Sequence, residues 1–140
     1  MQALYTAEAT AEGGRDGRAR SSDGALDVQL TSPPEMGGRD GGAGTNPEQL
    51  FAAGYAACFQ GAMQYVARQQ RLSVEGSTVT ARVGIGPRED GPGFGLQVAL
   101  DVALPSLDRE AAERLVASAH ESCPYSNATR GNVDVKLEVA

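Results

Sequence analysis

The chain has 140 residues and a formal net charge of -6. This acidic balance argues against nucleic acid or an anionic membrane as a partner, because both carry negative charge themselves. No apolar run approaches the roughly 20 residues that span a bilayer, and residues 1–6 lack the basic and apolar regions of a secretion signal. We therefore expect a cytoplasmic protein that forms a single domain over residues 1–140.

The first third of the chain predicts short strands joined by glycine-rich turns. Leu26, Val28 and Leu30 alternate with polar residues, which is typical of a strand with one buried face. In chain order, we expect a weak strand over 3–11, a turn over 13–17, a short return strand over 18–22, a strand around 26–30 and a long loop over 33–44.

A long helix is predicted from Pro47 to about Arg68. Asn46 is a suitable N-cap, and Pro47 fits the first helical position because its missing N–H would have no partner there. In an alternative register Thr45 is the cap and Glu48 is the third residue of a capping box. Both registers start the helix cleanly.

The predicted helix has no solvated face between Leu50 and Met63, where only Gln60 is strongly polar. Such a helix is normally buried on most sides, yet one small sheet with a single apolar face cannot surround it. Its small residues would let a second helix approach closely, and a second copy of the chain is the natural cover, so we expect a homodimer. These small residues are Ala52, Ala53, Gly54, Ala56, Ala57, Gly61 and Ala62.

The second half of the chain predicts a hairpin, a helix and a last strand. A turn at 91–93 separates the two strands of the hairpin, and the helix begins at 105–108 and stops at Pro124. The expected apolar face of the first strand is Val79, Ala81, Val83 and Ile85, and that of the second is Leu96, Val98, Leu100, Val102 and Leu104. The last strand has Val133, Val135, Leu137 and Val139 on its apolar face. Strands with one apolar face favour antiparallel sheets, and the order βββ-α-ββ-α-β places the chain in the α+β class.

Two kinds of site have weak support from the residues. The glycine-rich loop before the long helix lacks the usual phosphate-binding spacing, and Asp40 and Glu48 would place negative charge where an anion must bind. Cys58, Cys123 and the single His120 could supply three metal ligands, and Cys58 with His120 could form a nucleophile–base pair. Nothing in their spacing singles out either arrangement.

A pair of redox-active cysteines is the stronger hypothesis. Cys58 and Cys123 are 123 − 58 = 65 positions apart, so only the fold can bring them together. Cys123 lies at a helix C-terminus, where the dipole disfavours a thiolate, whereas burial of Cys58 would raise its pKa. Cys58 therefore needs a cation beside it, and Arg15 is a better candidate than Arg18 or Arg20, which alternate along an exposed strand.

Four segments carry a resemblance to a known family. The segments from Asn46 to Phe59 and from Cys123 to Asn132 resemble the two cysteine motifs of the organic hydroperoxide resistance proteins, the peroxidase branch of the OsmC/Ohr superfamily. The segments 13–17 and 83–86 are similar to this family too. The resemblance covers nearly the whole chain.

This resemblance implies a thiol-dependent peroxidase with an OsmC-like α+β fold, in which sheets surround the central helices of an intertwined homodimer. Cys58 matches the peroxidatic cysteine and Cys123 the resolving cysteine, while Arg15 and Glu48 match the pair that holds the thiolate and orients the peroxide. Organic and lipid hydroperoxides would become alcohols through a Cys58 sulfenic acid and a Cys58–Cys123 disulfide. No metal or bound cofactor is implied, and the reductant would be an external dithiol on a lipoylated protein.

Aromatic side chains near Cys58 are the expected substrate-binding residues: Phe51, Tyr55, Phe59 and Tyr125. The alternative to a peroxidase is a non-enzymatic binding or structural dimer whose buried thiols are inert.

Glu48 and Cys58 are 58 − 48 = 10 residues apart on the predicted helix, an axial offset of about 15 Å. A carboxylate so far away cannot touch the thiol of its own chain. We therefore expect a site shared between two chains, in which Glu48 of one serves the Cys58 of the other through Arg15.

Overall fold

The computed structural model describes residues 1–140, which form six strands, three α-helices and two short 3-10 turns. The chain divides into two compact units, Met1–Leu50 and Phe51–Ala140. The expectation of a single domain over 1–140 stays a prediction, and each unit is described by itself below.

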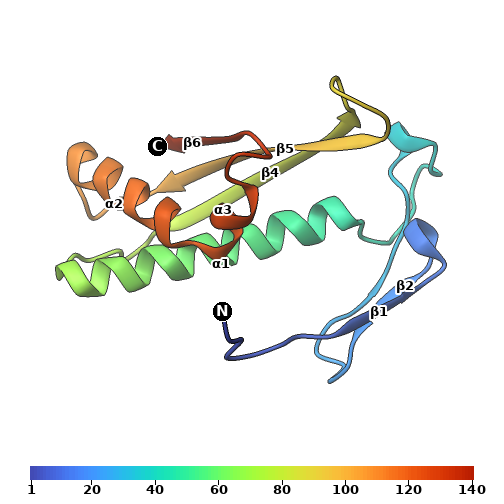
Figure 1. Ribbon diagram of the computed structural model, residues 1–140, viewed down its shortest axis with the longest axis horizontal. Coiled ribbons are helices and arrows are strands. Elements are labelled where there is room, and N and C mark those ends of the chain that lie inside the picture. Colours follow the sequence, from blue (N-terminus) through green and yellow to red (C-terminus); the bar gives the residue numbers. More distant parts are fainter. The chain divides into compact units, whose positions relative to one another are not determined.

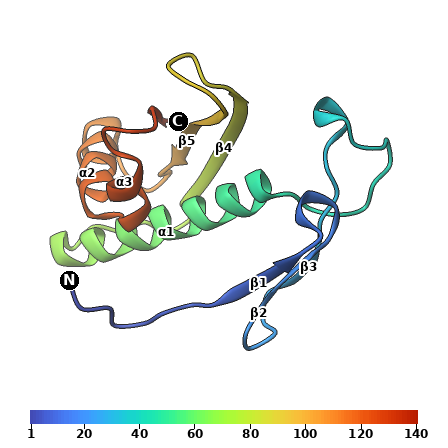
Figure 2. The same cartoon turned by 45° about the vertical axis from the view of Figure 1, so that its right-hand side comes forward.

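The first unit contains a three-stranded antiparallel sheet in the order β1-β2-β3 (Figure 2). Its strands are β1 (Ala9–Glu12), β2 (Arg18–Ser21) and β3 (Asp27–Gln29), so only the end of the strand predicted over 3–11 is regular. The two 3-10 turns are η1 (Gly14–Asp16), between β1 and β2, and η2 (Pro34–Met36), in the predicted loop.

The turn around η1 requires glycine at two kinds of position. Gly13 and Gly14 have positive φ angles of 80° and 58°, which L side chains rarely adopt. A Cβ at Gly17 would lie 1.7 Å from the carbonyl oxygen of Glu12, so no side chain fits there. These glycines let the chain reverse tightly and leave Arg15 at the centre of the turn.

The sheet of the first unit has no buried side chain, and Leu30 is the only buried residue of this unit. Small sheets are stable only with an apolar face that packs against something. Within one protomer, the first unit therefore lacks a hydrophobic core of its own.

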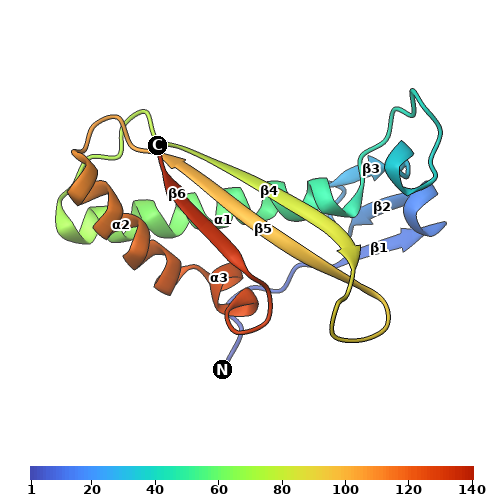
Figure 3. The same ribbon diagram turned by 90° about the horizontal axis from the view of Figure 1, so that it is seen from above.

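The second unit contains a sheet in the order β4-β5-β6, built from β4 (Thr78–Pro87), β5 (Phe94–Ala103) and β6 (Val135–Val139) (Figure 3). β4 and β5 form the predicted antiparallel hairpin, but β6 pairs parallel to β5. The expectation of antiparallel sheets throughout was therefore wrong for β6. The helices between β5 and β6 form a crossover that returns the chain to the starting end, so β6 runs in the direction of β5.

Three helices complete this unit: α1 (Pro47–Gln70), which begins in the first unit, α2 (Arg109–Ser122) and α3 (Pro124–Thr129). Helices α1 and α2 lie on the same side of the sheet (Figure 1). None of the helices combines the length and hydrophobicity needed to cross a bilayer. The predicted element order is confirmed, with α3 as an addition.

The core of the second unit lies between the sheet and the two long helices. Its buried members come from α1, α2, β5 and the loops: Tyr55, Phe59, Met63, Val66, Ala67, Val98, Leu100, Val102, Leu104, Ala112, Leu115, Val116, Ala119 and Cys123. The predicted inward faces of the strands supply Val79, Ala81, Val83, Val133, Val135, Leu137 and Val139 around this core.

Within one protomer, α1 is buried along one stripe only. Ala53, Ala57 and Gly61, spaced four residues apart along the helix, are exposed. An apolar helix that exposes a line of small residues leaves room for the backbone of another helix.

Candidate active site

Arg15 and Glu48 form a bidentate ion pair in the first unit. Arg15 Nη1 donates to Glu48 Oε2 at 2.8 Å, and Nη2 donates to Oε1 at 2.7 Å. The hydrogen bonds from Arg15 hold the pKa of Glu48 below its ordinary value, and the same bonds raise the pKa of Arg15. Both groups are therefore charged at neutral pH, and the guanidinium is oriented by the carboxylate.

The start of α1 leaves Glu48 free for this pair. The Gln49 N–H donates to Asn46 Oδ1 at 2.8 Å, so Asn46 is the N-cap and the alternative capping box from Thr45 is not formed. Thr45 instead donates to the side chain of Gln49 at 2.6 Å. The sequence left two roles open for Glu48, and the structure assigns the ionic one.

Arg18 and Arg20 are engaged elsewhere. Arg18 donates to both carboxylate oxygens of Asp27, at 2.7 and 2.6 Å, and Arg20 lies 3.8 Å from the same group. These pairs link neighbouring strands of the sheet, and both arginines lie on the exposed side of β2, as predicted.

The two cysteines meet in the second unit. Their Sγ atoms lie 3.7 Å apart, although 65 positions separate them, and both are free thiols. Cys123 is fully buried, whereas Cys58 is only partly buried. A reagent from solvent therefore reaches Cys58 first, and a short movement would join the two sulfurs.

Burial and two neighbouring residues determine the acidity of Cys58. Burial raises the pKa of its thiol, the backbone N–H of Tyr125 opposes this by hydrogen bonding, and the Cys123 thiol adds to the rise. Within the second unit, no cation assists the thiolate. The second unit alone therefore supplies no charge that would stabilise a Cys58 thiolate.

Cys123 joins two helices. It is the C-cap of α2, as predicted, and also the residue before α3, which the sequence did not predict. Pro124 does end α2, but as the first residue of α3 it also begins the next helix. The short connection places Tyr125 two residues from Cys123 with its N–H toward Cys58.

Three of the four aromatic residues that were expected to bind substrate form a cluster. The ring centroids of Phe51 and Tyr55 are 6.2 Å apart, those of Phe51 and Tyr125 6.0 Å, and those of Tyr55 and Tyr125 5.6 Å. Gly54 makes room for this packing, since a Cβ there would lie 2.9 Å from the Tyr125 hydroxyl. Phe59 packs instead toward His120, at 6.5 Å.

These aromatic residues differ in accessibility. Tyr55 and Phe59 are fully buried, whereas Phe51 is partly exposed and Tyr125 is 39% exposed. In this conformation only Phe51 and Tyr125 offer surface to a molecule that approaches Cys58.

A chain of polar contacts joins α2, α3 and α1. His120 Nδ1 lies 2.8 Å from Ser126 Oγ, which lies 2.8 Å from the Tyr55 hydroxyl, and that hydroxyl lies 3.2 Å from Thr129 Oγ1. Burial lowers the pKa of His120, and the nearby Arg130 lowers it further, so the imidazole is neutral at pH 7. No role was predicted for Ser126 and Thr129 from the sequence, although both lie in the segment from Cys123 to Asn132 that carries the family resemblance. Their three-residue spacing places both on one face of α3.

The whole-chain comparison decides the family. Residues 38–138 match the family model described as OsmC-like protein. The chain is 58% identical to the organic hydroperoxide resistance protein of Xanthomonas axonopodis pv. citri over 138 residues, which cover 98% of this chain and 95% of the relative. The chain belongs to the OsmC-like family, in its organic hydroperoxide resistance branch.

Solved structures of OsmC-like proteins agree with this assignment. The organic hydroperoxide resistance protein OhrB of Bacillus subtilis matches with a TM-score of 0.91 and 51% identity, covering 99% of this chain and 100% of that chain. One from Legionella pneumophila matches with a TM-score of 0.92 and 51% identity over 99% of both chains. The α+β, OsmC-like fold class predicted from the sequence is confirmed.

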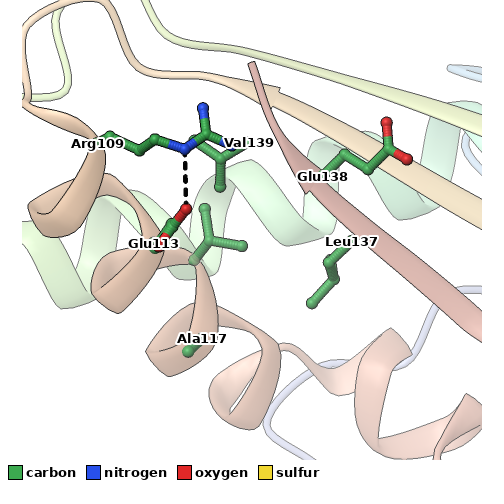
Figure 4. Close-up of a pocket in the computed structure, with 7 residues that line it drawn as sticks. Arg109, Glu113, Ala117, Leu137, Glu138 and Val139 are labelled. Carbon is green, nitrogen blue, oxygen red and sulfur yellow. Dashed lines mark ion pairs between the residues drawn. The ribbon is translucent and has the colours of Figure 1, made fainter.

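The metal-ligand set considered above receives no support in this OsmC-like chain. No group of three or more His, Cys, Asp or Glu side chains is arranged to hold a metal ion, so Cys58, Cys123 and His120 do not form the ligand set considered above. An open groove lies between α2 and β6, where Arg109 and Glu113 pair at 3.0 Å (Figure 4). Neither cysteine lines this groove.

Proposed function

We propose that this chain is a thiol-dependent peroxidase that reduces organic and lipid hydroperoxides to alcohols. The observation that carries the proposal is the pair of free thiols, one partly exposed and one fully buried, with sulfurs 3.7 Å apart. Membership of a family whose relatives are named organic hydroperoxide resistance proteins supports the same substrate class. No bound cofactor is needed, because the two thiols supply two electrons.

The reaction would proceed in two steps. The Cys58 thiolate attacks the hydroperoxide, the O–O bond breaks, the sulfur retains one oxygen as a sulfenic acid, and the alkoxide takes up a proton to leave as an alcohol. The Cys123 thiolate then attacks the Cys58 sulfur, an S–S bond forms, and hydroxide leaves and is protonated to water. An external dithiol, which we assign to a lipoylated protein, reduces the disulfide by two thiol exchanges.

Arg15 and Glu48 would provide the missing activation of Cys58. The second unit supplies no cation to offset the burial that raises the Cys58 pKa, and Arg15 is a guanidinium already held by a carboxylate. A planar guanidinium can bind a carboxylate and a thiolate at once, which an ammonium does poorly. Glu48 and Cys58 are ten residues apart on α1, so we assign the two to different chains of a dimer.

A homodimer would also resolve two features of the protomer. The sheet of the first unit has no buried side chain, and α1 exposes Ala53, Ala57 and Gly61 along one line. A second copy of the chain would bury both surfaces in a single twofold interface. We place this homodimer in the cytoplasm, where free thiols persist.

The test is a titration of free thiols before and after one equivalent of cumene hydroperoxide. We expect both thiols to disappear in the wild-type protein, with one equivalent of alcohol formed. Cys58→Ser should abolish peroxide consumption, whereas Cys123→Ser should retain the first attack and accumulate sulfenic or sulfinic acid at Cys58. Oxidation that appears first on Cys123 by mass spectrometry would reverse the assignment.

The same titration separates the peroxidase from the alternative, a binding or structural dimer with inert thiols. The raised pKa of Cys58 in the second unit favours this alternative, because a protonated thiol is a poor nucleophile. Thiols that survive an excess of hydroperoxide would establish it.

A further inference from the structure

Four side chains from three helices form a continuous chain of contacts beside the thiol pair. They are His120 on α2, Ser126 and Thr129 on α3, and Tyr55 on α1. Tyr55, Ser126 and Thr129 are buried. The peroxidase mechanism above uses none of their polar atoms.

The protons in this chain can be placed from the contacts alone. Thr129 Oγ1 lies 3.2 Å from the Ser126 carbonyl oxygen, which can only accept, so the single Thr129 proton points there. Tyr55 must then donate to Thr129, Ser126 to Tyr55, and His120 Nδ1 to Ser126. No other order places one proton in each contact, so the imidazole carries its proton on Nδ1.

The network joins the elements that carry the two sulfurs. Cys58 lies three residues after Tyr55 on α1, and Cys123 lies between His120 and Ser126 at the junction of α2 and α3. Its hydrogen bonds therefore fix α3 and the end of α2 against α1 at the level of the thiols.

We propose that Ser126, Tyr55, Thr129 and His120 are positioning residues for the second step, in which Cys123 attacks the sulfur of Cys58. The inference deepens the proposed function and rests on it. Attack at sulfur requires the two sulfurs and the leaving group to be aligned, and a misplacement of about 1 Å can cost up to about a hundredfold in rate. The first step needs Cys58, its activating Arg15 and an incoming peroxide, but not the Cys123 sulfur, so it does not depend on this alignment.

The second step can be observed without peroxide by using the disulfide reagent DTNB. Cys58 attacks the reagent, which releases one thionitrobenzoate and leaves a mixed disulfide on Cys58. Cys123 then attacks the Cys58 sulfur, the protein disulfide forms, and a second thionitrobenzoate leaves. Absorbance at the thionitrobenzoate band therefore rises in two phases, and Cys123→Ser identifies the second by removing it.

Ser126→Ala is the principal variant, because it removes one buried hydroxyl and little volume. We expect the first phase to stay within about twofold of the wild type and the second to slow by about tenfold or more. Tyr55→Phe should lower the ratio of the second rate to the first in the same way. His120→Asn keeps an N–H donor on the atom bonded to Cγ, so it should retain a faster second phase than His120→Leu.

Two matched controls test the same chemical changes outside the network. Tyr65→Phe removes from α1 a hydroxyl that is exposed within one protomer and accepts a bond from Gln69. Ser122→Ala removes an exposed hydroxyl from α2. Both should leave the two phases unchanged. General loosening would accelerate the first phase by exposing Cys58, so the first-phase rate separates loosening from misalignment. Both phases are measured at a temperature at which thermal unfolding shows that each variant is folded.

The outcomes are distinct. A second phase at the wild-type rate in Ser126→Ala and Tyr55→Phe, or both phases changed equally, overturns the inference. Wild-type protein that shows both phases but consumes no hydroperoxide overturns the proposed function and leaves the positioning role intact. In a working peroxidase, slow resolution should also raise the yield of Cys58 sulfinic acid at a fixed excess of hydroperoxide, with Ser122→Ala as the reference.

Discussion

The buried hydrogen-bond network also makes a quantitative prediction for stability. In the proton order above, Tyr55→Phe removes the only acceptor of the Ser126 hydroxyl while Thr129 keeps its bond to the Ser126 carbonyl. One buried donor is then unsatisfied, which costs about 1–3 kcal/mol. Ser126→Ala leaves the His120 Nδ1–H without its acceptor, and because His120 is only partly buried we expect about 1–2 kcal/mol.

The double variant should cost less than the sum of the two. Once Ser126 is alanine, Tyr55→Phe leaves no unsatisfied hydroxyl at position 126, so the two changes should couple by about 1–2 kcal/mol. The assay is urea unfolding followed by circular dichroism at one fixed protein concentration, because association would make the apparent stability depend on concentration. Tyr65→Phe and Ser122→Ala, alone and combined, should stay within about 0.5 kcal/mol of the wild type. Additive effects of Tyr55→Phe and Ser126→Ala would refute the proposed order of donors.

Four further predictions concern the site. Arg15→Lys should lose much of the peroxidase rate while keeping the charge, and the Cys58 pKa measured by alkylation should rise in Arg15→Ala; an unchanged alkylation profile would exclude Arg15 as the activator. Bulky organic hydroperoxides should be preferred over hydrogen peroxide, because each buried methylene contributes about 0.8 kcal/mol, and equal catalytic efficiencies would contradict this. Mixing Cys58→Ser with Glu48→Ala under subunit exchange should restore activity, since each mixed dimer regains one intact site; a dead mixture with proven exchange would place the site within one chain. Because the folded state lowers the pKa of His120, the contribution of the neutral imidazole to the free energy of unfolding is complete above its ordinary pKa of about 6.5 and is lost as the pH falls through the lower folded value. His120→Asn should therefore flatten this part of the profile of stability against pH, measured by urea unfolding. An identical profile in the variant would show that other groups cause the pH dependence.

Elements whose signals are local were predictable from the sequence. The cap at Asn46 and the apolar run after it gave the start of α1, and alternation gave the inward faces of β4, β5 and β6. Asp108 caps α2 by accepting from the Ala111 N–H at 2.8 Å, close to the predicted start.

Features that depend on distant partners were not predictable. The same alternation occurs in parallel and antiparallel strands, so it could not show that β6 runs parallel to β5. Ser126 and Tyr55 are 71 positions apart, and a buried hydroxyl in a six-residue helix has no periodic signal. Glu48 could have been a capping residue or the partner of an arginine, and only the contact with Arg15, 33 positions away, shows that it is the latter.

The long separation of the two cysteines along the chain has a thermodynamic consequence. A Cys58–Cys123 disulfide would close a loop of 65 positions, and the loss of chain entropy in the unfolded state then favours the folded protein by about 4 kcal/mol. For a chain of this length, that corresponds to a rise in melting temperature of roughly 15 °C. The oxidised protein would thus be the more heat-resistant form, and each turnover would pass through a reduced state that unfolds more readily.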